Sequence, residues 1–176
     1  MKWKEYVVEN YLQEKGGKYE LLKPAIREKI YRELTSNDES KILNASKILI
    51  GLDNLNFTQK EISDIEKKCE NLPKSKSSSM RDYRQDVNAG IMLIKHFDDG
   101  AKCKCGVYEK WIQFPPEREV EIGYLSIQKE PYTNLEKYQI EYDLKCMICK
   151  TEWQANQNDG YHYPIYEWVK KGANIV

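Results

Sequence analysis

Two close pairs of cysteines constrain the fold of this chain more than any other feature. Cys103 and Cys105 are separated by one residue, and Cys146 and Cys149 are separated by two. A turn that carries two cysteines can offer two thiolates to one metal ion, and two such turns supply the four soft ligands of a tetrahedral zinc site. The segment between the pairs must therefore fold so that the two turns meet.

We expect a structural Zn²⁺ in this place. The ligands that the spacing predicts are Cys103, Cys105, Cys146 and Cys149. Gly106 follows the tighter pair and permits the sharp backbone bend that such a turn needs. An iron–sulfur cluster or unliganded thiols are the alternatives, because the first pair departs from the commoner ribbon pattern of two Cys-x-x-Cys turns. Four thiolates occupy every tetrahedral position, so we assign the site no catalytic role.

Composition is typical of a globular chain. Its 176 residues are enough for one domain, or for a helical part and a β part that share a core. The 28 basic residues balance the 28 acidic ones, which counts against non-specific binding to nucleic acid. No apolar run is long enough to span a membrane, and no secretion signal is recognisable at the start. We expect a cytoplasmic protein, in which reduced thiols favour metal over disulfides.

Residues 1–98 have the apolar spacing of about five helices. The best-marked helix start is the pair Thr58 and Glu61, which fits a capping box. Phe57 and Ile62 flank it at the positions of a hydrophobic staple, in which two apolar side chains pin the entry of the helix.

Four further residues of the chain carry specific expectations. Pro24 is expected to open the second helix, because proline is favoured in the first helical position. Cys69 lies on the apolar side of its helix, which predicts a buried and unreactive thiol. Ser79 is expected to cap the fifth helix. His162 lies between two tyrosines, and we expect it to be a packed residue rather than a catalytic one.

Residues 99–176 have the pattern of a small antiparallel sheet. Apolar and polar residues alternate from Tyr138 to Cys146, as in a strand with one buried face. From Glu119 to Lys129 the alternation changes phase beside Gly123, which predicts a strand with a bulge. Pro164 is expected to open a short C-terminal helix. The sequence thus predicts an α+β fold, in which an N-terminal helical bundle packs on a zinc-braced antiparallel sheet and shares its core.

One part of the helical region resembles a known class of repeats. Residues 26–52 contain an apolar helix, a Ser-Asn-Asp-Glu turn and a second helix that carries Ala45 and Leu49. This pattern resembles a helical repeat of the HEAT or armadillo kind, and residues 87–93 resemble the second helix of another unit. Such families bind proteins or nucleic acids, so the resemblance implies binding rather than catalysis. A generic helical bundle explains the same residues.

The profile as a whole favours a non-catalytic protein-binding module. The β region resembles a zinc ribbon, the net charge is zero, and no recognisable enzymatic motif is present. This combination is similar in type to small bacterial immunity proteins, which implies a toxin domain as the partner. A basic toxin would meet acidic residues that we expect beside the exposed sheet face. These are Glu117, Glu119, Glu121, Glu141 and Asp143.

Two other functions stay open. A nucleic-acid-binding protein would use the lysines around the cysteines to contact phosphates, namely Lys102, Lys104, Lys145 and Lys150. A magnesium-dependent nuclease would use Asp143 and Lys145, together with one of the acids at positions 117, 119 and 121. The 13 tyrosines and four tryptophans are expected mainly in the core of the sheet, with stacking on bases or on a partner as the alternative.

Overall fold

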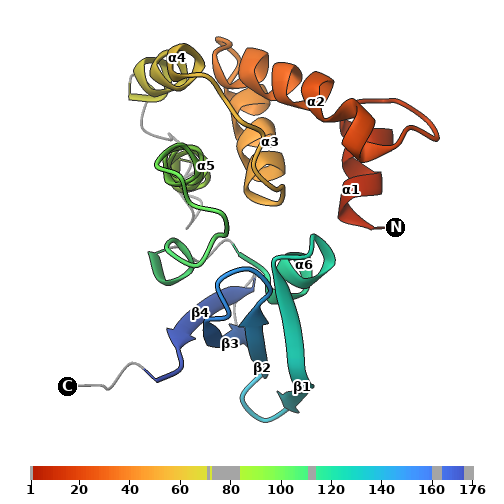
Figure 1. The fold of residues 1–176 in the computed structure, drawn as a ribbon, viewed down its shortest axis with the longest axis vertical. Helices are drawn as coiled ribbons and strands as arrows, with labels where there is room; N and C mark the ends of the chain where they lie inside the picture. Colours follow the sequence, from red (N-terminus) through yellow and green to blue (C-terminus); the bar gives the residue numbers. More distant parts are fainter. Residues whose placement is uncertain (1, 71, 73–83, 111–113, 160–163, 173–176) are drawn as a thin grey trace. The chain divides into compact units, whose positions relative to one another are not determined.

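The computed structural model describes residues 2–70, 72, 84–110, 114–159 and 164–172. The chain divides into two compact units, which we call the helical unit (Met1–Gly100) and the sheet unit (Ala101–Val176) (Figure 1). The predicted α+β class is confirmed, since helices fill the first unit and one four-stranded antiparallel sheet lies in the second. The core shared between them stays a prediction. No helix in the described ranges has the length and apolar character that a membrane crossing needs.

The helical unit is built around one apolar cluster. Its elements are α1 (Trp3–Tyr6), the π-helical turn η1 (Val7–Tyr11), α2 (Tyr19–Leu34), α3 (Glu39–Ile50), α4 (Gln59–Glu70) and α5 (Arg84–Asp98). Side chains from successive helices meet in the cluster, among them Ile26, Ile42, Ile65 and Val87, each at most 2% exposed. Burial of such side chains contributes about 1.5–3 kcal/mol each, so this cluster is the main source of the unit's stability.

The capping box predicted at the start of α4 is confirmed. The Thr58 N–H donates to the Glu61 carboxylate at 2.7 Å, and the Glu61 N–H donates to Thr58 Oγ1 at 3.3 Å. Phe57 packs against the apolar cluster, to which Ile62 also belongs, as the hydrophobic staple requires.

Two details of the helical unit differ from the prediction. Pro24 lies inside α2, because the helix begins earlier, at Tyr19. The Tyr19 ring is buried and its hydroxyl donates to Asp53 at 2.7 Å, which anchors the first turn. The first predicted helix is divided into a single α-turn and the π-helical turn. The expectations for Ser79 and His162 lie outside the described residues.

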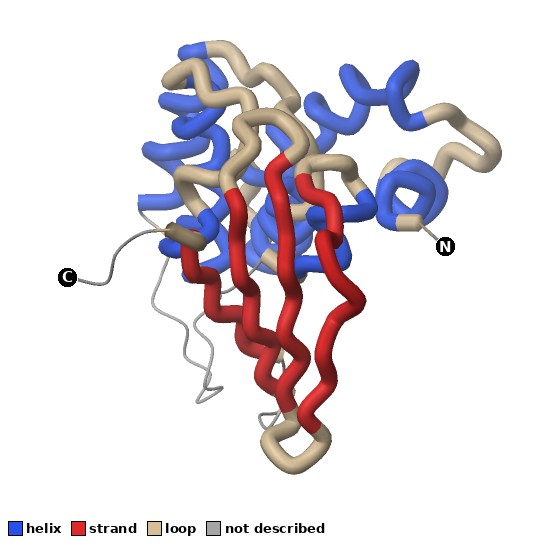
Figure 2. Tube along the Cα trace, turned by 60° about the horizontal axis from the view of Figure 1, so that its bottom comes forward, coloured by secondary structure: helices blue, strands red, loops and turns tan. Residues whose placement is uncertain are grey.

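The sheet unit consists of a meander of four strands and two short helices. Its elements are the 3₁₀ turn η2 (Tyr108–Lys110), α6 (Pro116–Glu121), β1 (Leu125–Asn134), β2 (Gln139–Cys146), β3 (Glu152–Asn158) and β4 (Ile165–Lys170). The strands lie side by side in chain order, and each neighbouring pair is antiparallel (Figure 2). Strand β2 has the predicted alternation, with Tyr142, Leu144 and Cys146 buried on one face.

Two predictions for this region differ from the structure. The strand expected from Glu119 to Lys129 is found only from Leu125 onward, because residues 116–121 form helix α6, with Pro116 in a first helical position and acidic residues in the first turn. Gly123 lies in the turn after that helix at φ +92°, and the irregularities of β1 occur later, around Lys129. The expected C-terminal helix is strand β4, in which Trp168 is paired with Ala155 of β3 and buried.

Aromatic residues form the core of the sheet unit. The ring of Tyr108 stacks on Trp168 with centroids 4.4 Å apart, and it meets Trp153 edge-on at 5.6 Å. The Trp168 indole N–H donates to the carbonyl of Phe114 at 3.2 Å. Buried aromatic rings with satisfied polar atoms are stabilising core residues, as expected from the sequence. They are therefore not exposed platforms for stacking on bases.

Candidate metal centre

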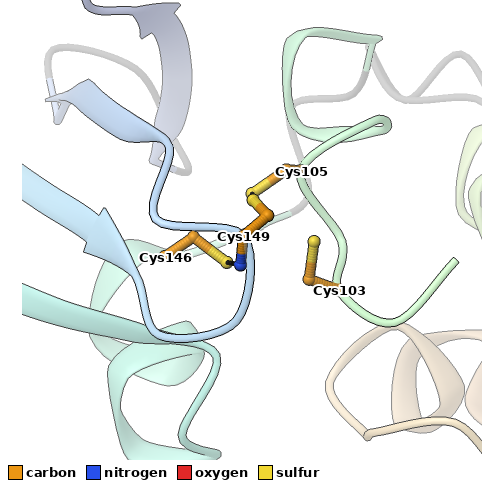
Figure 3. A group of neighbouring side chains, drawn as sticks. All are labelled: Cys103, Cys105, Cys146 and Cys149. Carbon is orange, nitrogen blue, oxygen red and sulfur yellow. Dashed lines mark hydrogen bonds between the residues drawn. The ribbon is translucent and has the colours of Figure 1, made fainter.

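The structure brings all four predicted cysteines together within the sheet unit. Cys103 and Cys105 lie in the loop before η2, Cys146 is the last residue of β2, and Cys149 lies in the turn between β2 and β3 (Figure 3). Their sulfur atoms are all within 4.8 Å of one another. The cluster therefore joins a loop to the end of a hairpin.

The separations suit four ligands of one ion. Tetrahedral zinc with Zn–S bonds of about 2.3 Å places its sulfurs about 3.8 Å apart. The Cys105 and Cys149 sulfurs are 3.4 Å apart, and the four sulfurs all lie within 4.8 Å of one another. These separations lie on both sides of the distance expected between zinc ligands. A disulfide needs an S–S distance of about 2.05 Å, and all five cysteines are free. The cluster could hold a metal ion.

The turn between β2 and β3 has the hydrogen bonds of a metal-binding knuckle. The backbone N–H groups of Ile148 and Cys149 both donate to Cys146 Sγ at 3.4 Å. The turn closes through Lys150, whose N–H donates to the Cys146 carbonyl at 3.1 Å and whose φ is +63°. Donors directed at sulfur stabilise a thiolate, which is the form that binds metal.

Side chains of β3 and of the segment before it complete the surroundings of the sulfurs. The indole N–H of Trp153 donates to Cys105 Sγ at 3.3 Å, and the hydroxyl of Thr151 lies 3.2 Å from Cys149 Sγ. Trp153 thus has two roles, because its ring also packs against Tyr108 in the aromatic core. Trp153 therefore connects the cysteine cluster to the aromatic core of the sheet unit.

Without metal, the thiols of the cluster differ in acidity. Burial raises the pKa of Cys103 to about 11 and raises that of Cys105 still further. Burial acts in the same direction on exposed Cys149, but hydrogen bonds from Thr151 and from neighbouring thiols outweigh it and lower its pKa to about 6. Metal binding must displace protons from the buried thiols, so affinity for the ion will fall as the pH is lowered.

Cys69 is separate from the cluster. It lies in α4, packs against the apolar core of the helical unit, and is partly buried. Burial raises the pKa of its thiol to about 11, which makes it a poor nucleophile at neutral pH. The prediction of an unreactive core thiol is supported, and Cys69 offers a control for substitutions at the metal site.

A buried ion pair beside the cluster was not predicted. Lys104 lies between two of the cysteines, and its Nζ is 3.0 Å from Glu119 Oε1, with both side chains fully buried. The Tyr108 hydroxyl donates to Glu119 Oε2 at 2.9 Å. The Lys104 ammonium also lies over the rings of Tyr124 and Phe114, 5.2 and 5.6 Å from their centroids.

This ion pair links the first cysteine turn to α6. A buried charge is tolerated only where partners replace its lost hydration, and here one carboxylate, one hydroxyl and two aromatic rings surround the pair. The nucleic-acid alternative placed Lys104 on phosphate, and the toxin hypothesis placed Glu119 on an acidic surface. Neither residue has such a role, since neither side chain reaches solvent.

The remaining acidic candidates do not share one face. Glu117 accepts from the hydroxyl of Tyr142, whose side chain points to the buried face of β2. Asp143 has the opposite orientation on the same strand and pairs with Lys171 and with Lys129, the latter at 3.4 Å. The hydrogen bond from Lys171 is the main cause of the lowered pKa of Asp143. No set of three ligands converges on Asp143 in the described part of the chain, so a magnesium site is not supported.

Comparisons with protein-family models, with curated proteins and with solved structures found no match. The resemblances noted from the sequence stay predictions, and the four-sulfur geometry carries the functional argument.

Proposed function

We propose that this chain is a non-catalytic protein-binding module whose sheet unit is braced by one structural Zn²⁺. The observation that carries the proposal is the convergence of four cysteine sulfurs within 4.8 Å. Four thiolates suit zinc, which accepts tetrahedral sulfur coordination without geometric strain. They also close the coordination shell, so no position is left for a substrate.

Zinc would act here as a cross-link in a small unit. The loop with Cys103 and Cys105 pairs with no strand in the part of the unit that the structure describes, and the ion would tie it to the β2–β3 turn. Units of this size seldom obtain enough stability from apolar burial alone and commonly need a metal or disulfides. In this proposal the metal stabilises the fold, and the surface of the sheet binds the partner.

The surface that we propose for binding is at the far end of the β1–β2 hairpin. Tyr132, Leu135 and Tyr138 are 61, 81 and 67% exposed, and we call them the hairpin patch. The loop that carries two of them closes one end of the sheet (Figure 2). Exposed aromatic and leucine side chains near the end of one hairpin are typical of contact sites, because a partner gains by removing them from water.

The specific protein-binding module that we propose is an immunity protein, which neutralises a toxin domain. Two residues of the expected acidic face do not support a basic toxin as the partner, because Glu119 is buried and Asp143 is paired with two lysines. The hairpin patch supports an apolar contact instead. A toxin partner stays a proposal, to be tested by coexpression with candidate toxin domains.

We expect Leu135→Lys to weaken partner capture about tenfold or more, since charging a central contact residue removes its burial energy. The measurement compares proteins captured from a lysate of the source cells by the metal-loaded wild type and by the variant. Leu21→Lys is the matched control, because Leu21 is equally exposed, at 76%, but lies in the helical unit. Partners lost with Leu21→Lys as readily as with Leu135→Lys would contradict the hairpin patch.

The structure weakens the case for nucleic-acid binding, because three of the lysines that would contact phosphate are buried or already paired. Lys104 is buried, Lys145 pairs with Glu152 at 3.3 Å, and the Lys150 ammonium donates to the Met147 carbonyl at 2.7 Å. Phosphate contacts need free cations, and each one contributes to a steep dependence on salt. Binding of an oligonucleotide that weakens strongly between low and moderate salt would restore this alternative.

A further inference from the structure

A cavity in the helical unit has the properties of a ligand site. Its volume is about 180 Å³, and it lies among α3, α5, the start of α4 and the loop before α4. Seven of the eleven residues that line it are apolar, among them Leu49, Leu93, Ile94 and Phe97. This cavity is distinct from the cysteine cluster and from the hairpin patch, so the inference drawn from it does not depend on the proposed function.

The cavity is open to solvent on one side. Leu49, Leu93, Ile94 and Phe97 in its wall are at most 8% exposed, whereas Asn56 and Asp98, which also line it, are exposed. A space of about 150 Å³ between apolar side chains can hold a benzene-sized molecule. A ring of matching shape gains free energy because its own surface and that of the apolar wall residues are removed from water.

The carboxylates that line the cavity favour a positively charged ligand. Asp53 is already balanced, because it lies 3.2 Å from the ammonium of Lys23 and 3.8 Å from that of Lys4. Asp98 accepts a hydrogen bond from the Gln59 amide and has no cationic partner among the described residues. A carboxylate in that position attracts a cation and repels an anion, and the apolar wall around the opening lowers the local dielectric constant.

We infer that this cavity binds a small-molecule amine whose apolar ring fills the interior and whose ammonium group lies at Asp98. The ring provides most of the affinity through burial against Leu49, Leu93 and Ile94. The ammonium provides selectivity, since neutral and anionic molecules of the same shape lack the ion pair. A partly exposed pair of this kind contributes up to about fivefold in affinity at low salt.

Three probes of equal ring size test the inference on the full-length, metal-loaded protein. Benzylamine, benzyl alcohol and phenylacetate are titrated at low salt while the methyl signals of leucine and isoleucine are followed by NMR. We expect benzylamine to shift the signals of Leu49, Leu93 and Ile94, to bind several-fold more tightly than benzyl alcohol, and to lose that advantage in high salt. Phenylacetate should bind most weakly.

Two substitutions at neighbouring acids separate the role of Asp98 from general surface charge. Asp98→Asn should remove the preference for benzylamine over benzyl alcohol, whereas Asp99→Asn should leave it unchanged, because Asp99 does not line the cavity. Both positions are exposed, so both variants should fold. Ile94→Phe should abolish binding of all probes by filling the space. Absence of methyl shifts with every probe, equal affinity for all three, or the same loss in both Asn variants overturns the inference.

Discussion

Replacement of Cys146 by serine is expected to remove the bound metal and to unfold the sheet unit. Cys146 is fully buried, ends β2 and accepts two backbone hydrogen bonds from the knuckle turn. Structural zinc sites contribute about 10–16 kcal/mol of binding free energy at neutral pH, which is comparable to or larger than the total stability of a typical domain. The loss should appear as absent metal in elemental analysis and as a lost near-ultraviolet signal of the aromatic core.

The helical unit should keep its helices in this variant, because its apolar cluster consists only of residues before Gly100. Far-ultraviolet circular dichroism would then retain the helical bands. Cys69→Ser is the matched control and should keep both the metal and the aromatic signal. If Cys146→Ser retained a full equivalent of metal and the wild-type unfolding temperature, the structural role of the cluster would be wrong.

Replacement of Lys104 by methionine is expected to destabilise the metal-loaded protein by about 3–5 kcal/mol, because it leaves the Glu119 carboxylate buried without its cation. Urea unfolding of the wild type and the variant measures this change. Lys145→Met is the matched control. Its ammonium is paired with Glu152 in an exposed position, and such pairs contribute about 1 kcal/mol or less.

A combined variant separates an unpaired charge from lost packing. Changing Lys104 and Glu119 to methionine together with Tyr108→Phe removes both charges of the pair and the hydroxyl that donates to Glu119. Apolar replacement of a whole buried pair is often close to neutral, and we expect the triple variant to be more stable than Lys104→Met. If the triple variant loses as much unfolding free energy as its three single variants lose in sum, then lost packing, and not the unpaired charge, causes the destabilisation.

The sequence predicted which four cysteines come together but not the residues that surround them. Paired cysteines are a local signal, and a strand that ends at Cys146 with faultless alternation indicated where one turn lies. The contact between Lys104 and Glu119 joins residues on a loop and a helix, and charged side chains are normally assigned to the surface. The sequence did contain one signal, the three-residue spacing of Pro116, Glu119 and Ile122. In the structure all three residues are buried, on the inner side of α6 and its end.

Tertiary context also decided the elements that were mispredicted. Pro164 precedes a strand because Trp168 on β4 completes the aromatic core, and that requirement cannot be recognised from residues 164–172 alone. Pro24 is tolerated inside α2 because the helix is anchored upstream by the buried Tyr19. The capping box at Thr58 was predicted correctly because all of its hydrogen bonds are local.

X-ray absorption of the purified protein tests the central claim most directly, because it gives the identity of the metal, its ligand type and its bond lengths together. We expect one zinc per chain, coordinated by four sulfurs at about 2.3 Å, with no nitrogen or oxygen ligand. Iron with inorganic sulfide, zinc with fewer than four sulfurs, or a folded protein that binds no thiophilic metal would contradict it.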